Sequence, residues 1–137
     1  MIKGLVTSIF ILFTLLALTI IFMSTGWFLI VFIIVMPPAM LLHFMAWYRS
    51  IKWHPELYGW VALSSTIFLI FSLLRLDKDE EGLYNGYQVV AYYLKLIESP
   101  HSEPLNYSLE ISLTLLLGMI ILDAIILRKA LKKHTKI

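Results

Sequence analysis

One ionisable side chain interrupts an apolar stretch of this chain and could carry chemistry. Asp123 lies within residues 111–127, which are otherwise free of charge. A charged side chain inside a membrane costs on the order of 3 kcal/mol on insertion scales, so it is a functional candidate by default. Proton or ion handling is the functional interpretation. In the structural one, Asp123 reaches the membrane surface near Arg128, or pairs with Arg49 or Lys52.

The four histidines raise the question of a haem or metal site. His43 is the one that stands clearly inside an apolar stretch, so a haem with two histidine ligands lacks a second ligand at matching depth. The pattern H-x-E at residues 54–56 is too short to be specific for a metal. We therefore expect no metal and no cofactor, with His43 as a polar group inside the membrane.

Nucleophilic catalysis is also disfavoured by the sequence. The chain has no cysteine, and G-x-S-x-G, phosphate-loop and H-E-x-x-H motifs are absent from it. The hydroxyl residues Ser64, Ser65 and Thr66 lack a histidine at comparable depth in the neighbouring sequence. We expect that the chain is not an enzyme.

Two consecutive prolines, Pro37 and Pro38, interrupt the stretch that contains His43. They remove two backbone donors and clash with the carbonyls one turn earlier, around Ile33 and Ile34. Such breaks persist in membranes where neighbouring helices, hydroxyls or water satisfy the freed groups. We predict a kinked or split second span. The break is either a static bend or a hinge like those in broken transporter helices.

The elements that carry these residues are long apolar segments. The chain has 60% hydrophobic and 15% charged residues, too apolar for a soluble domain of this size. A helix needs about 20 residues to cross the hydrocarbon core, and residues 24–26 offer a flexible polar turn after the first segment. The sequence predicts an all-α integral membrane protein, with one polytopic domain over residues 1–137 and four spans at about residues 4–23, 27–47, 57–75 and 109–127.

The charges predict the orientation. Residues 75–110 hold three basic and seven acidic side chains, a net charge of −4, whereas the remainder holds eight basic and two acidic ones, a net charge of +6. Cytoplasmic loops carry an excess of Lys and Arg. We therefore predict a cell (inner) membrane protein with both termini in the cytoplasm and residues 76–108 outside.

The outer segment contains a predicted short helix over residues 86–98. Asn85 and Gln88 have the spacing of a capping box, and apolar residues recur at three- and four-residue steps, as in an amphipathic helix. One interpretation is that the helix lies on the membrane surface. The other is that its tyrosines receive a partner, since tyrosine is enriched at interfaces. The apolar positions are Tyr87, Val90, Leu94 and Ile97, and the proposed docking tyrosines are Tyr84, Tyr87, Tyr92 and Tyr93.

Small and hydroxyl residues predict where spans approach one another closely. On the fourth span, Thr114 and Gly118 lie on a face nearly opposite to that of Asp123. Because neither face suits lipid, we expect either coverage by helices of the same chain or contact with a second protomer. The predicted packing residues are Ala62, Ser65, Ser72, Thr114 and Gly118.

These features predict a non-catalytic membrane protein that acts by protein–protein contact, as an oligomer or in a complex. A sensor, an anchor subunit or an immunity or defence component fits this description; small polytopic immunity proteins are similar in layout, without a shared motif. The alternative is a subunit of an oligomeric channel or transporter that uses Pro37, Pro38 and Asp123. The expected partners are the lipid bilayer, further copies of the chain or another protein, and no nucleic acid.

Overall fold

The computed structural model describes residues 1–23, 26–79, 82–101 and 107–135. Four long helices dominate it: α1 (Ile2–Phe22), α2 (Trp27–Trp53), α3 (Tyr58–Leu74) and α5 (Ser108–Thr135). Each contains a stretch long and apolar enough to cross a membrane. The chain is thus mostly helical, with four helices compatible with a multi-pass membrane protein. Of the turn predicted at residues 24–26, only Gly26 belongs to the described residues.

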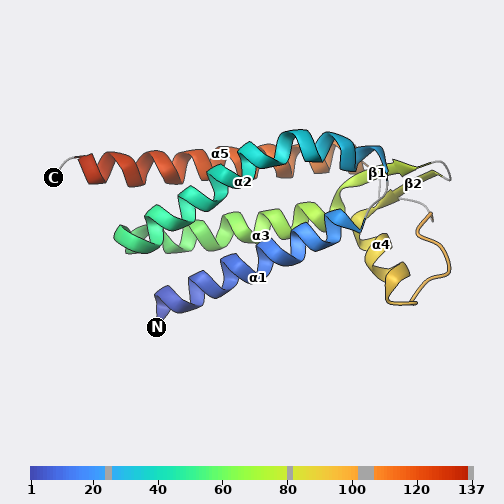
Figure 1. Ribbon diagram of the computed structural model, residues 1–137, viewed down its shortest axis with the longest axis horizontal. Coiled ribbons are helices and arrows are strands. Elements are labelled where there is room, and N and C mark those ends of the chain that lie inside the picture. The colour runs from blue at the N-terminus through green and yellow to red at the C-terminus, as the bar shows by residue number, and fades with distance from the viewer. Residues whose placement is uncertain (24–25, 80–81, 102–106, 136–137) are drawn as a thin grey trace.

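The helices form an elongated bundle (Figure 1). Helix α3 packs between α1 and α5, and α2 packs mainly on α5. The short 3-10 helix η1 (Pro55–Leu57) joins α2 to α3. Both chain ends lie at one end of the bundle in Figure 1. The opposite end carries a small folded region, residues 76–79 and 82–93, which we call the hairpin end. This arrangement agrees with an even number of crossings.

Helix α2 continues through both prolines without interruption between Trp27 and Trp53. The predicted alternative of two separate segments is therefore wrong. Pro37 and Pro38 are exposed on the outside of the bundle. The predicted bend at this point stays a prediction.

The hairpin end contains structure that the sequence patterns did not predict. Strand β1 (Leu76–Asp79) pairs antiparallel with β2 (Gly82–Asn85), and α4 (Gly86–Tyr93) follows directly. The fold is therefore helical with a small two-stranded sheet rather than all-α. The strands are short and carry charged residues, so period-two alternation is weak and the pattern is easily missed.

Helix α4 begins as predicted but ends early. The Asn85 and Gln88 side chains form the predicted capping box. The helix stops at Tyr93 instead of Glu98, because the Lys95 N–H donates to Tyr92 O (3.0 Å) and the Leu96 N–H donates to Ala91 O (2.9 Å). These two bonds, with Lys95 at φ +62°, make a Schellman motif that turns the chain away.

Two apolar clusters fill the bundle interior, one toward the termini and one toward the hairpin end. In each helix, the residues of the two clusters follow one another at helical spacing, so one stripe of each helix faces inward. The first cluster contains Val6, Phe10, Ala46, Ile51, Leu57, Val61, Ile126 and Ala130. The second contains Ala17, Ile21, Phe32, Met36, Ala39, Phe68, Phe71 and Met119.

Candidate functional site

A polar layer separates the two apolar clusters. It consists of Thr14 from α1, His43 from α2, Ser64 from α3 and Asp123 from α5. In each helix this residue stands in sequence between members of the two clusters: His43, for example, lies between Ala39 and Ala46. The inward spacing of each helix therefore brings the four polar groups to one level.

Short hydrogen bonds connect this layer. His43 Nδ1 lies 2.7 Å from Asp123 Oδ2, and Ser64 Oγ donates to Asp123 Oδ1 at 2.5 Å. An ionised carboxylate only accepts, so with Asp123 ionised the hydrogen of the first contact lies on His43 Nδ1. On the other side of the imidazole, Nε2 lies 3.3 Å from Thr14 Oγ1. The His43 and Asp123 side chains are each only 2% exposed, so the pair is sealed inside the bundle.

This geometry corrects two expectations. Asp123 neither reaches the surface nor pairs with Arg49 or Lys52; its partners are His43 and Ser64. Ser64 does have a histidine at its own depth, since its Oγ lies 3.3 Å from His43 Nδ1. A sequence signal for this pairing existed: both residues stand about equally far from the turn at His54, so an antiparallel hairpin places them side by side.

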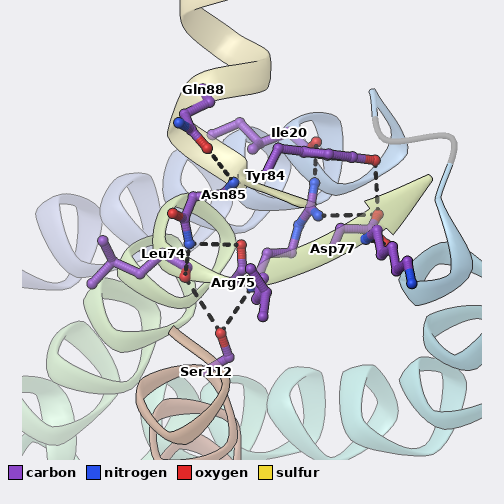
Figure 2. Close-up of polar contacts among 10 residues, drawn as sticks. Ile20, Leu74, Arg75, Asp77, Tyr84, Asn85, Gln88 and Ser112 are labelled. Atoms are coloured by element: carbon purple, nitrogen blue, oxygen red, sulfur yellow. Dashed lines mark hydrogen bonds and ion pairs between the residues drawn. The ribbon is translucent and has the colours of Figure 1, made fainter. Parts of the chain in front are cut away.

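A second polar network ties the hairpin end to the bundle (Figure 2). Arg75 is fully buried. Its Nη2 donates to the Ile20 carbonyl at the end of α1 (3.1 Å), and its Nη1 lies 3.6 Å from Asp77 Oδ2. The Tyr84 hydroxyl donates to the same carboxylate oxygen (3.0 Å). Burial lowers the pKa of the Arg75 guanidinium, and the Asp77 carboxylate acts in the opposite direction.

Asn85 extends this network to α3 and α5. Its Nδ2 donates to the Leu74 carbonyl and to Ser108 Oγ, both at 3.0 Å, while its N–H donates to Gln88 Oε1 at 2.6 Å. The Leu76 N–H donates to Ser112 Oγ (3.0 Å). We call this set the hairpin-end network: the Ile20 carbonyl, Arg75, Asp77, Tyr84, Asn85, Gln88, Ser108 and Ser112.

The proposed docking tyrosines fall into two groups. Tyr84 is 2% exposed and belongs to the hairpin-end network, so it is not available to a partner. Tyr87 is half-buried, whereas Tyr92 and Tyr93 are exposed and meet edge to face (5.6 Å between ring centroids). They begin the tip, residues 92–98, whose side chains Tyr92, Tyr93, Lys95, Leu96, Ile97 and Glu98 line an open groove.

The predicted apolar stripe of α4 does not face the bundle as a whole. Gly86, Gln88 and Val89 are the buried residues of this helix, while Leu94 is 64% exposed. The early end of α4 rotates everything after Tyr93 out of the predicted helical register.

The predicted packing residues fall into two groups, one buried on α3 and one on an uncovered face of α5. Ser65 and Ser72 are buried on α3 and Ala62 is half-buried, as close helix packing requires. On α5, Thr114 is exposed, and a Cβ added at Gly118 would meet no other atom within 4 Å. The face of Asp123 is thus covered by this chain, whereas the face of Thr114 and Gly118 lies open.

Comparison with known proteins adds no family to this description. No protein-family model matches the chain, and no curated protein or solved structure was found to be similar to it.

Proposed function

We propose that this chain is a non-catalytic multi-pass membrane protein that acts by contact with another protein at its hairpin end. The observation that carries the proposal is the folded connection between α3 and α5. Two packed helices need only about 2–8 connecting residues, so a connection with its own strands and helix does more than join α3 to α5. Residues 75–107 instead include a hairpin, a helix and a buried polar network.

The tip suits a binding role because hydrogen bonds fix the residues that precede it, while its own side chains are exposed. The hairpin-end network fixes the start of α4, and the Schellman motif fixes the turn at Lys95. Beyond this base, Tyr93 is 56% exposed and Leu96 is 74% exposed. Rigid aromatic side chains that lose little freedom on binding are the usual anchors of protein interfaces. A sensor, an anchor subunit or an immunity or defence component would use such a tip.

The charge distribution supports an orientation with the hairpin end outside and both termini in the cytoplasm of a cell (inner) membrane. Because the chain has no native cysteine, Glu80→Cys and Thr135→Cys give a clean test. An impermeant thiol reagent added to intact cells should label position 80 and spare position 135. The reverse pattern would overturn the orientation.

Site-specific photocrosslinking in living cells tests the contact itself. A photoreactive phenylalanine analogue at position 93 should give one discrete protein adduct, which Leu96→Ser should abolish. The same analogue at position 107 is the matched control, because Tyr107 is also an exposed tyrosine near the hairpin end but lies outside the tip. Crosslinks from position 93 to lipid alone would make the tip a membrane-surface element and end the contact proposal.

A second candidate, a subunit of an oligomeric channel or transporter, is favoured by the polar layer. His43 on α2 contacts Asp123 on α5 and lies less than two turns after Pro37 and Pro38. Intramembrane carboxylates mark ion and proton pathways, and each proline removes a backbone hydrogen bond from its helix. The purified chain in liposomes should then carry an ion or proton flux that Asp123→Asn abolishes. A flux equal to that of empty liposomes would reject this candidate.

A further inference from the structure

The polar layer has the composition of a proton-binding site. All four spanning helices contribute to it: Thr14 on α1, His43 on α2, Ser64 on α3 and Asp123 on α5. Among the described residues, the rings of Phe10 and Phe68 also lie against the imidazole, at 4.8 and 5.8 Å between centroids. The two titratable groups that face one another are therefore His43 and Asp123.

The charge state of this pair depends on a single proton. With His43 neutral and Asp123 ionised, the layer carries one uncompensated negative charge among apolar side chains. One additional proton makes the pair neutral overall, which a region of low polarity favours. It also turns the Nδ1–H···Oδ2 contact into a charge-assisted hydrogen bond. Binding a proton therefore removes the net charge of the pair, and the Asp123 carboxylate then accepts a hydrogen bond from the imidazolium.

The additional proton would be bound at His43 Nε2, the imidazole nitrogen that does not face Asp123. Nδ1 already carries a hydrogen toward Asp123, so Nε2 is the position that gains or loses one. Thr14 Oγ1 stands 3.3 Å from Nε2. A hydroxyl can donate to a bare nitrogen or accept from an N–H, so Thr14 serves both states without a change of partner.

We propose that His43 Nε2 binds a proton reversibly, with Asp123 as its fixed counter-charge and Thr14 as the group that positions it. Ser64 holds the Asp123 carboxylate by its other oxygen, so that the carboxylate keeps its orientation when His43 changes state. This site does not depend on the contact proposed for the hairpin end, which lies at the far end of the bundle from the termini.

Nitrogen NMR of the full chain, labelled at histidine and held in lipid nanodiscs, tests the site. The shifts distinguish the two neutral tautomers from the imidazolium, and His43→Gln assigns the signal. We expect the His43 signal to change between the Nδ1–H tautomer and the imidazolium as pH is varied. Asp123→Asn removes the counter-charge and should lower the imidazolium fraction at a pH where the unaltered chain is partly protonated.

Thr14 provides a milder pair of variants in case Asp123→Asn disturbs folding. Thr14→Val keeps the shape but leaves Nε2–H without an acceptor, so the imidazolium fraction should fall; Thr14→Ser should restore it. A merely structural Thr14 would leave the His43 signal unchanged in both variants. A His43 signal that stays in one protonation state over the whole range in which the bundle is folded would overturn the proposal, as would an unaltered titration in Asp123→Asn and Thr14→Val.

Discussion

The polar layer and the hairpin-end network bury polar groups in different ways. In the hairpin-end network, Arg75 and Asn85 each donate to a backbone carbonyl, and most members lie within residues 75–88. In the polar layer, side chains bond to side chains across separations of 29, 59 and 80 residues. Backbone groups do not titrate and must be satisfied in every state. The first arrangement is therefore suited to holding a shape, and the second is the one in which we propose a proton-binding site.

The largest expected effect lies at Arg75. Arg75→Met removes a fully buried cation and leaves Asp77 buried without its ion-pair partner. Breaking a buried pair in this way costs about 3–5 kcal/mol. We expect this loss in the free energy of unfolding, measured by SDS titration in mixed micelles.

Lys78→Met is the matched control for this loss, because Lys78 lies three residues further along the chain, in β1, and is exposed. A change as large as that of Arg75→Met would show that added hydrophobicity, not the buried pair, accounts for the difference. An unaltered free energy of unfolding in Arg75→Met would remove the structural role assigned to the hairpin-end network.

A smaller loss is expected at Gly86, where α4 approaches α3 most closely. A Cβ at this position would overlap the Ser72 backbone carbonyl, which cannot rotate away. Forcing such an atom into a packed contact costs about 1–3 kcal/mol, so Gly86→Ala should destabilise the hairpin end. Hydrogen exchange of the α4 amides should then become faster while that of α3 is unchanged. Gly59→Ala, where a Cβ meets open space, should leave both rates as they are.

Ser64→Ala tests the polar layer by removing one bond without a change of charge. Side-chain hydrogen bonds between membrane helices average about 0.6 kcal/mol and reach about 1.7 kcal/mol, so the loss in the free energy of unfolding should fall in that range. Ser65→Ala is the neighbouring control, because the Ser65 hydroxyl bonds to Val61 O within its own helix. Equal effects of the two variants would mean that the bond to Asp123 contributes nothing to the attachment of α3 to α5.

The smallest effect on the single chain is expected on the face of α5 that neither network reaches. Gly118→Leu should leave the free energy of unfolding within about 0.5 kcal/mol, since Gly118 is half-buried but a Cβ there meets open space. If copies of the chain associate by close approach at this glycine, the same variant should lower the particle mass measured in lipid nanodiscs. An unchanged mass would place any self-association on another surface.

Much of this protein follows from its sequence alone. The apolar segments are long enough to cross a bilayer and must satisfy their backbone groups internally, so four long helices follow from local composition. The start of α4 could also be predicted from the sequence, because a capping box is formed by residues three positions apart, here Asn85 and Gln88. Such features depend on groups that are neighbours along the chain.

Tertiary structure decided the partners of the buried polar groups. Asp123 could be recognised as a costly residue, but its bond to His43 bridges 80 positions and depends on how α2 packs on α5. The burial of Tyr84 likewise depends on how the hairpin end packs, where its hydroxyl bonds to Asp77. The early end of α4 is a local turn, but Lys95 and not glycine occupies its left-handed position, so the sequence gives little sign of it. Side-chain pairing across helices is set by depth and rotation of each helix, and neither is encoded by residues adjacent in sequence.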